Sequence, residues 1–438
     1  MFKTLPGFRE FPPEECSRRN FFFSHWRGVA RRYRFQEFDG PVLEPLDLYR
    51  EKSGAEIQEQ LFHFTDKGGR EVALRPEMTP TLARMVGARL GSLRKPVRWF
   101  SIGEQFRYER YQKGRKRSFY QLNADIIGEE GPAAELELIA LLIDLLEAFG
   151  LGAEDFAVRL SDRTLWMLFL SGLGLSGEES LQVLAVVDKL GREPEEVLEQ
   201  KLQPFFGAEA LEVLGKIIGF SQLTSLKDVR QFLEKQGIAE TAYEERMAAW
   251  EELWQGIQAM GLGDYVQIDL GIVRGLAYYT GFVFEAFDRA KSHRALAGGG
   301  RYDHLLGVLS KKGAPAAGFG MGDVVLQDML EEKHKLPRWI EKTDVYVVAI
   351  TPEEQAVALS AVRALRLAGF ITDYALRKVA PKKQFKAADE AGASVVVIIG
   401  PEEKSRGEVK LKHLGRGEEV TVENGAMIPR LEELLAGG

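Results

Sequence analysis

The sequence has one cysteine and no long hydrophobic run. A single thiol, Cys16, excludes a disulfide within the chain, and the six histidines show no metal-ligand spacing with it or with each other. No apolar stretch approaches the roughly 20 residues that a membrane-spanning helix needs. The start of the chain lacks the features of a secretory signal or a transit peptide. We therefore expect a cytoplasmic protein with no membrane segment and no structural metal.

The chain also lacks the positive charge of a general polyanion binder. Its formal net charge is −7 at pH 7, which still allows nucleic acid to be contacted through a local basic surface. Of its 438 residues, 45% are hydrophobic and 28% are charged, as in ordinary globular proteins. At roughly 150 residues per domain, this length predicts about three domains.

The first three quarters of the chain predict an α+β core with a mainly antiparallel sheet, interrupted by helices. Apolar residues at helical spacing predict a helix over 18–35. Short apolar segments bounded by Gly, Pro and Asp then predict strands near residues 42, 61, 72, 97 and 119. A helix is expected over 134–149, and residues 163–260 are almost entirely helical in pattern.

Strand character returns at residue 266, where β-branched and aromatic residues reappear, and GGGRYD at 298–303 predicts a turn. The first sheet is therefore expected to resume. After a charged stretch at 331–343, strands alternate with helices, as in a small α/β domain. The expected parts are a core in two pieces, 1–162 and 263–332, a helical insertion between them, 163–262, and a C-terminal domain, 343–438.

The segment 106–128 carries a dense group of basic residues between two apolar flanks: Arg107, Arg110, Lys113, Arg115, Lys116 and Arg117. Guanidinium groups offer paired, permanently charged donors, so a loop of this kind between strands can clamp a triphosphate. A solvated basic hairpin is the alternative.

This segment resembles motif 2 of the class II aminoacyl-tRNA synthetases, and its RYERYQKGR…FYQ pattern is similar to the histidine-specific branch. The resemblance implies that Arg107 holds the α-phosphate of ATP, Glu109 meets the adenine side, Arg115 reaches the outer phosphates and Phe119 stacks on adenine. ATP would enter with Mg²⁺ as a substrate, and no tightly bound cofactor is implied. The loop with Gln112 and Lys113 would reach the tRNA acceptor end.

A second segment, IVRGLAYYTGFVFEA at 272–286, resembles the histidine-binding motif of histidyl-tRNA synthetases and their paralogues. The resemblance implies that Arg274 is a catalytic cation near the α-phosphate, with Tyr278 and Tyr279 lining the histidine pocket. If both tyrosines lie in a strand, they point to opposite faces. Only Tyr279 is then expected to contact the imidazole.

A third segment, ALRPEMTPTLARM at 73–85, resembles the loop that grips the α-ammonium of the amino acid. Glu77 and Thr79 suit that task because a cation needs a carboxylate and a neutral acceptor, and Met78 between them is assigned to the same site. A purely structural alternative makes Thr79 the N-cap of a helix.

Gln121 and Asp125 lie on one face of the strand near 119 and, by the same resemblance, contact histidine. The family usually has Glu at the second position, so Asp125 is one methylene shorter.

The segment GFGMGDVVLQDML at 318–330 occupies the place of class II motif 3, with its glycines expected in a turn that enters a helix. That motif normally ends in Gly-x-x-Arg, whereas here Gly322 is followed by Asp323, Val324 and Val325. The arginine is missing, as in a plastid and bacterial branch of the family that this pattern resembles. Near the start, Pro41 matches the proline of motif 1, which implies a homodimer.

The C-terminal segment resembles the anticodon-binding domain of class IIa synthetases. The resemblance suggests that Lys382, Lys383 and Lys386 contact RNA phosphate. The alternative is that these lysines form a solvated helix face.

The implied activity is that of a histidine–tRNA ligase, which uses histidine, ATP and histidine tRNA. The alternative is the non-catalytic paralogue that regulates ATP phosphoribosyltransferase. That paralogue typically lacks the anticodon-binding domain and has a degraded basic loop in motif 2, whereas both features are present here.

Overall fold

The computed structural model describes residues 2–50, 60–109, 114–273, 278–290, 292–310, 313–337 and 343–436. Contacts divide the chain into two units, Met1–Leu336 and Pro337–Gly438. Among the described helices, none is long and apolar enough to cross a membrane.

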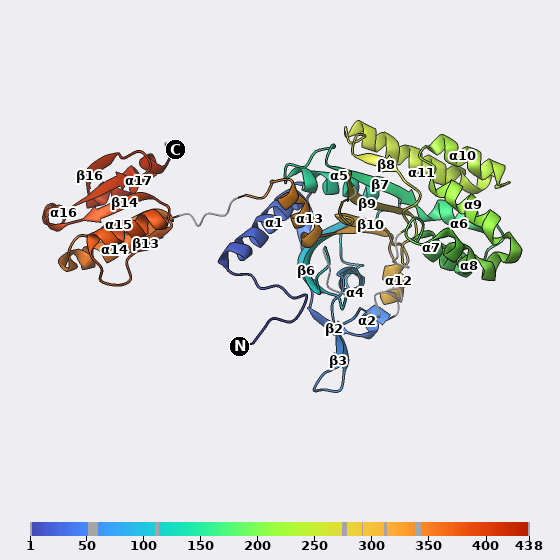
Figure 1. The fold of residues 1–438 in the computed structure, drawn as a ribbon, viewed down its shortest axis with the longest axis horizontal. Helices are drawn as coiled ribbons and strands as arrows, with labels where there is room; N and C mark the ends of the chain where they lie inside the picture. The colour runs from blue at the N-terminus through green and yellow to red at the C-terminus, as the bar shows by residue number, and fades with distance from the viewer. Residues whose placement is uncertain are drawn as a thin grey trace. The chain divides into compact units, whose positions relative to one another are not determined.

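The first unit is built on one large sheet (Figure 1), whose inner strands are all antiparallel and whose two edge pairs, β1–β5 and β7–β8, are parallel. Three strands that follow the helical segment, β9, β10 and β11, lie between strands β6 and β7 that precede it, which confirms that the sheet resumes. In spatial order its strands are β1 (Gln36–Glu37), β5 (Val97–Phe106), β6 (Ser118–Ile127), β11 (Ala316–Gly322), β10 (Ala297–Arg301), β9 (Phe282–Asp288), β7 (Phe156–Asp162) and β8 (Val266–Ile268).

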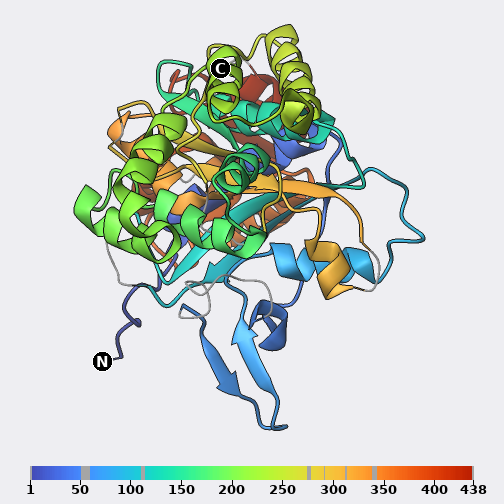
Figure 2. The same ribbon diagram turned by 90° about the vertical axis from the view of Figure 1, so that its right-hand side faces the viewer.

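A second, small sheet projects from the large one (Figure 2) and contains β2 (Leu43–Pro45), β4 (Glu71–Leu74) and β3 (His63–Thr65). The predicted first helix is α1 (Pro13–Arg32), and it buries Phe22, Trp26, Val29 and Ala30 in the main core. The same core takes up most of the strongly apolar α5 (Ala133–Glu147) and part of α13 (Asp323–Glu332). The shorter helices are α2 (Asp47–Arg50), α4 (Thr79–Gly87) and α12 (Leu305–Leu309).

Residues 163–259 form helices only, as predicted (green to yellow in Figure 1). Asp162, the last residue of β7, begins this segment: its carboxylate caps the first helix by accepting the N–H of Thr164 at 2.7 Å. The same carboxylate accepts bonds from Arg246 and Trp250 of the last helix, at 2.5 and 2.7 Å. The helices are α6 (Arg163–Gly172), α7 (Gly177–Val187), α8 (Glu195–Phe206), α9 (Ala210–Ser221), α10 (Leu226–Lys235) and α11 (Glu240–Ala259).

The two glycine-rich segments that predicted turns are strands in the middle of the sheet, so those predictions were wrong. GGGR lies in β10 and GFGMG in β11, and the two strands pair with Gly299 opposite Phe319. A Cβ added at Gly299 would lie 2.2 Å from the carbonyl oxygen of Gly318, and one at Gly300 would lie 2.6 Å from that of Phe282. Glycine here permits the close approach of backbones rather than a turn.

The second unit contains a five-stranded sheet with helices, as the alternating pattern predicted. β12 pairs in parallel with β13 and β14, while β15 and β16 continue antiparallel. The sheet order is β13 (Thr372–Tyr374), β12 (Thr343–Ala349), β14 (Ala393–Ile399), β15 (Glu408–His413) and β16 (Glu419–Glu423). Its helices are α14 (Gln355–Leu367), α15 (Pro381–Glu390), α16 (Pro401–Arg406) and α17 (Met427–Ala436).

The substitution Gly299→Ala tests the packing of the central strands. The added methyl has no room, so we expect a loss of about 1–3 kcal/mol in the free energy of unfolding, as for other overpacked cores. Gly215→Ala is the matched control, because an added Cβ on this exposed residue of α9 meets nothing within 4 Å. It should stabilise the chain by about 0.5–1 kcal/mol. Thermal unfolding midpoints would compare them, and equal midpoints would contradict the packing argument.

Candidate active site

Polar side chains project from one face of β6 into the sheet's surface pocket. Gln121, Asn123 and Asp125 alternate with residues that enter the main core, as the two-residue period of a strand requires. In the register of β6 with β11, each stands opposite a glycine: Gly322, Gly320 and Gly318, respectively.

These glycines leave the space that the polar side chains occupy. A Cβ added at Gly318 would lie 1.9 Å from Asp125 Oδ1, and one at Gly320 would lie 1.8 Å from Gln121 Nε2. The glycines of motif 3 therefore contribute to the pocket by having no side chain.

The pocket on this face is small, about 50 Å³, and draws together residues from each of the segments with predicted histidine contacts. In the part of the chain that the structure describes, Gln121 Oε1, Asn123 Oδ1 and Asp125 Oδ2 are buried without a hydrogen-bond partner. Buried polar atoms are normally paired, so these acceptors suit a ligand that brings N–H donors. The side chains lining the pocket include Glu77, Thr79, Arg107, Gln121, Asn123, Asp125, Tyr278, Tyr279 and Tyr302.

Glu77 and Thr79 lie in the pocket as predicted. The hydroxyl of Tyr278 donates to Glu77 Oε2 at 2.8 Å, and burial together with the charge of Glu77 raises the pKa of Tyr278 well above its ordinary value. The tyrosine therefore remains a donor at neutral pH. The alternative that Thr79 is an N-cap is wrong, because α4 begins at Thr79 and Met78 holds the cap position without a side-chain bond. Met78 is fully buried and is not among the residues that line this pocket.

Tyr278 and Tyr279 precede β9 and are not in a strand, contrary to the prediction. The argument that they face opposite ways therefore does not apply. Both rings are buried, their centroids lie 5.1 Å apart, and both line the pocket.

Tyr302 is a pocket residue that the sequence did not reveal. Its hydroxyl donates to Asp125 Oδ1 at 2.6 Å. Burial raises the pKa of Asp125 to about 7, against the opposing effect of this hydrogen bond. Asn123 was also missed, although its position between Gln121 and Asp125 on the same strand face gave a usable signal.

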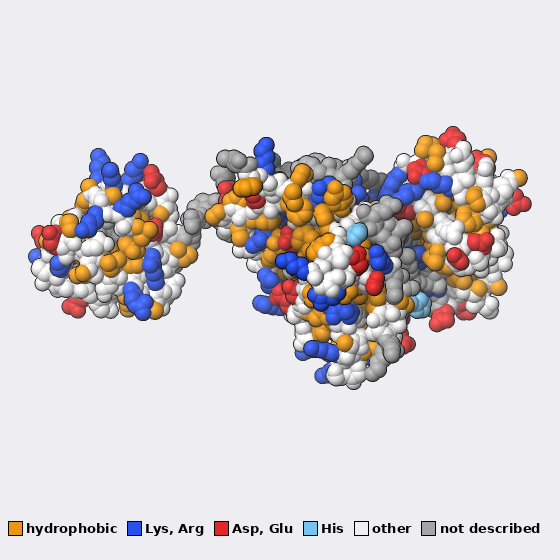
Figure 3. Space-filling model, turned by 90° about the horizontal axis from the view of Figure 1, so that it is seen from below, with side chains coloured by type: hydrophobic (Ala, Val, Ile, Leu, Met, Phe, Trp, Pro, Cys, Tyr) orange, Lys and Arg blue, Asp and Glu red, His pale blue; other side chains and the backbone are white. Residues whose placement is uncertain are grey.

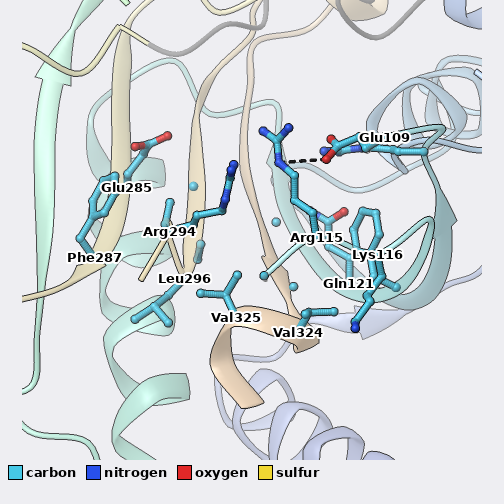
Figure 4. Close-up of a pocket in the computed structure, with 18 of the residues that line it drawn as sticks. Glu109, Arg115, Lys116, Gln121, Glu285, Phe287, Arg294, Leu296, Val324 and Val325 are labelled. Atoms are coloured by element: carbon cyan, nitrogen blue, oxygen red, sulfur yellow. Dashed lines mark ion pairs between the residues drawn. The ribbon is translucent and has the colours of Figure 1, made fainter. Parts of the chain in front are cut away.

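A larger cavity of about 730 Å³ adjoins the small pocket and shares Arg107 and Gln121 with it (Figure 4). The four predicted ATP residues all line this cavity, whose size is typical of small-molecule sites. Arg107 lies over the ring of Phe119, with 5.2 Å between guanidinium carbon and ring centroid, and its Nε donates to the carbonyl of Pro76 at 3.0 Å. Arg115 pairs with Glu109 at 2.9 Å.

The cavity also contains charged residues that were not predicted to be site residues. Arg192 comes from the helical segment, Glu285 from β9, and Arg294 from the connection between β9 and β10. Arg192 and Arg294 were missed because they lie outside the recognised motifs, whereas Glu285 lies within the segment 272–286 but no role was assigned to it. Arg274 lies outside the described residues, as do Arg110, Gln112 and Lys113 of the basic loop.

Asp323 begins α13 at the place of motif 3. Its carboxylate pairs with Arg9 at 2.8 Å and accepts the backbone N–H of Tyr120 at 3.0 Å, so it holds the N-terminal segment and β6 together. The next two residues, Val324 and Val325, line the large cavity with apolar side chains.

An antiparallel sheet with a cationic cavity beside a buried polar pocket, followed by a separate α/β unit, is the architecture of a class II aminoacyl-tRNA synthetase. Residues 7–323 match the family model of histidyl-tRNA synthetase, and residues 344–434 match that of the anticodon binding domain.

Relatives with assigned names agree with these matches. The chain is 50% identical to the histidine–tRNA ligase of Opitutus terrae, with 94% of each chain covered. It is 38% identical to the chloroplastic/mitochondrial histidine–tRNA ligase of Arabidopsis thaliana, covering 95% of this chain and 84% of that one. The crystal structure of histidyl-tRNA synthetase from a Nostoc species has the same fold, with a TM-score of 0.79 at 24% identity and 99% of both chains covered.

The chain belongs to the histidyl-tRNA synthetase family, and its function is the ligation of histidine to tRNA. The regulatory alternative is not favoured.

The raised pKa of Asp125 predicts a pH dependence of stability. The pKa of a free aspartate in the unfolded chain is about 4, whereas burial raises the pKa of Asp125 in the folded protein to about 7. Between these values the folded state holds a proton that the unfolded state has lost, so this residue's contribution to stability falls as pH rises. Asp125→Asn removes that contribution. The thermal unfolding midpoint of Asp125→Asn minus that of the wild type should therefore increase as the pH is raised from 4 to 7. A difference that does not change with pH would contradict the assignment.

Proposed function

We propose that the small pocket binds histidine and that the adjoining cavity binds ATP with its Mg²⁺. The observation that carries this proposal is the row of buried acceptor oxygens on Gln121, Asn123 and Asp125, which have no partner among the described residues. An imidazole ring and an ammonium group supply N–H donors for such oxygens. An analogue without these donors would leave the oxygens buried and unpaired, which gives the site its selectivity.

Within this pocket, the α-ammonium of histidine lies at Glu77 and Thr79, and the imidazole lies toward Asp125 and the tyrosines. The carboxylate of Glu77 is 4% exposed and so attracts a cation strongly. Asp125 has one oxygen engaged by Tyr302 and the other directed to the ligand. The tyrosine therefore positions the shorter carboxylate that replaces the family's usual glutamate.

In the cavity, Phe119 stacks on adenine, Glu109 meets its edge and Arg115 reaches the outer phosphates. Arg107 lines both spaces, so the histidine carboxylate and the α-phosphate would meet beside its guanidinium group. Arg274, which lies outside the described residues, is the second cation of this proposal. Arg115 pairs with Glu109, so the outer phosphates of ATP would compete with this carboxylate for the guanidinium group.

The chemistry runs in two steps. The histidine carboxylate attacks the α-phosphorus of ATP in line, pyrophosphate leaves and histidyl-adenylate forms. The terminal ribose hydroxyl of tRNA then takes the acyl group and AMP leaves. A carboxylate is already ionised at neutral pH, so the first step needs no strong general base. Positioning and charge neutralisation by Arg107, Arg274 and Mg²⁺ carry the catalysis.

The second unit holds the anticodon end of the tRNA in this proposal. Figure 3 shows basic side chains on its surface, and Lys382 and Lys383 of α15 are exposed. Lys386 pairs with Glu390 at 3.3 Å, which leaves the first two lysines as the better phosphate contacts. We retain 1–162, 163–262 and 263–332 as the parts of the first unit, with the helical part contacting tRNA. The protein acts in the cytoplasm, where its substrates meet.

Histidine-dependent exchange between ATP and pyrophosphate tests the assigned roles. Arg107→Ala and Arg274→Ala should each lower exchange by at least about 100-fold, the usual effect of removing one donor that stabilises transition-state charge. Arg363→Ala, an exposed arginine of the second unit, should leave exchange unchanged. Unfolding midpoints would show that each variant is folded. A wild-type protein that shows no exchange and instead stimulates a phosphoribosyltransferase would contradict the proposal.

We also propose a homodimer formed around the small sheet. Val42, Leu43 and Phe64 of this sheet region are 42%, 41% and 49% exposed, and apolar side chains gathered on a surface favour association.

The dimer is tested by molar mass in solution, from light scattering behind a sizing column. The wild type should elute as a dimer, and Leu43→Asp should convert it to a monomer because a charge cannot be buried unpaired at the interface. Leu359→Asp is the matched control, since Leu359 of α14 is 42% exposed. A monomeric wild type, or equal masses for both variants, would contradict this interface.

A further inference from the structure

Arg294 lies on the connection between β9 and β10, and this connection is fixed at its base by Asp288. The carboxylate of Asp288 accepts the backbone N–H of Ala290 at 2.9 Å and that of Ser292 at 3.2 Å, and it also contacts His293 Nδ1 at 3.1 Å. Asp288 is 2% exposed, so these bonds are shielded from water. These bonds hold the residues before Arg294, and the backbone N–H of Leu296 after it donates to the carbonyl of Ala286 at 2.8 Å, so the side chain of Arg294 enters the ATP cavity from a defined backbone.

The guanidinium group of Arg294 faces other cations. Figure 4 shows Arg294 and Arg115 directed toward the same part of the cavity from two different connections, the one between β9 and β10 and the one between β5 and β6. In the part of the chain that the structure describes, Arg294 has no hydrogen bond or ion pair, whereas Arg115 is paired with Glu109. Burial and the nearby charge of Arg115 lower the pKa of Arg294. Like charges brought together in a cavity favour an anion between them.

The stem of Arg294 borders the place of the missing motif 3 arginine. Val325 occupies that position in the sequence and lines the same cavity. A Cβ added at Gly114 would lie 3.6 Å from Arg294 Cδ and 3.7 Å from Val325 Cγ2, so both side chains border one small space. A long side chain at position 325 would compete with Arg294 for this space.

We propose that Arg294 binds the β- and γ-phosphates of ATP, opposite Arg115, and so supplies the charge that a motif 3 arginine would otherwise supply. This inference rests on the proposed ATP site. Arg107 serves the α-phosphate in that site, and Arg294 serves the pyrophosphate leaving group. Stabilising this group as it departs adds to the rate of adenylate formation as well as to ATP binding.

The first test separates the outer phosphates from the rest of the nucleotide. Binding of a non-hydrolysable ATP analogue and of AMP would be measured by calorimetry for the wild type, Arg294→Ala and Arg294→Lys. We expect Arg294→Ala to weaken binding of the ATP analogue by about tenfold or more, as for the loss of a charge-assisted hydrogen bond. AMP binding should change by less than twofold, and Arg294→Lys should recover part of the affinity. Equal losses for both nucleotides, or no loss for either, would overturn the proposal.

The second test exchanges the two positions. In the Arg294→Ala background, Val325→Arg should restore much of the histidine-dependent exchange and the KM for ATP, because the new guanidinium occupies the vacated space. The KM for histidine should stay near the wild-type value throughout. If the wild type exchanges pyrophosphate and Arg294→Ala does so equally well, only the role of Arg294 fails. If the wild type itself shows no exchange, the proposed ATP site fails with it.

Discussion

The close approach of β6, β11 and β10 is the constraint on which the site depends. Polar side chains on β6 fit against β11 only because glycines face them, and Asp125 and Gln121 fill the space that a Cβ at Gly318 or Gly320 would need. The face of the sheet therefore forms the part of the pocket that holds Gln121, Asn123 and Asp125. A rigid sheet holds the acceptor oxygens in place before any ligand arrives, which lowers the ordering cost of binding.

Much of the fold could be predicted because its signals are local. The Leu-rich pattern of 134–149 gave α5, the apolar runs near 97 and 119 gave β5 and β6, and the alternating C-terminal pattern gave the second unit. The return of β-branched residues at 266 showed that the sheet resumes, since such residues pack well on a pleated surface. Residue-type patterns at short range carry this information without knowledge of the tertiary contacts.

The remaining features depend on contacts between distant segments. The glycine-rich segments 298–300 and 318–322 predicted turns because glycine adopts many backbone conformations. In the structure, glycine is needed at these positions because the neighbouring strands lie too close for a side chain. The tyrosines at 278 and 279 were misplaced because the strand begins later, at Phe282. Tyr302 follows the end of β10 and Arg294 lies on the connection before it, and only the sheet order brings these segments beside β6 and α13.

Asp162 ties the helical segment to the sheet, so the segment is not an independent module. One carboxylate ends β7, caps α6 and accepts bonds from Arg246 and Trp250 of α11, so both ends of the segment meet at a single buried group. A rotation of these helices as a rigid body would have to break bonds shielded from water. A chimera that grafts another helical segment here would need to reproduce an acceptor at 162 together with its two donors, which makes this junction, rather than helix length, the criterion for transplanting the segment.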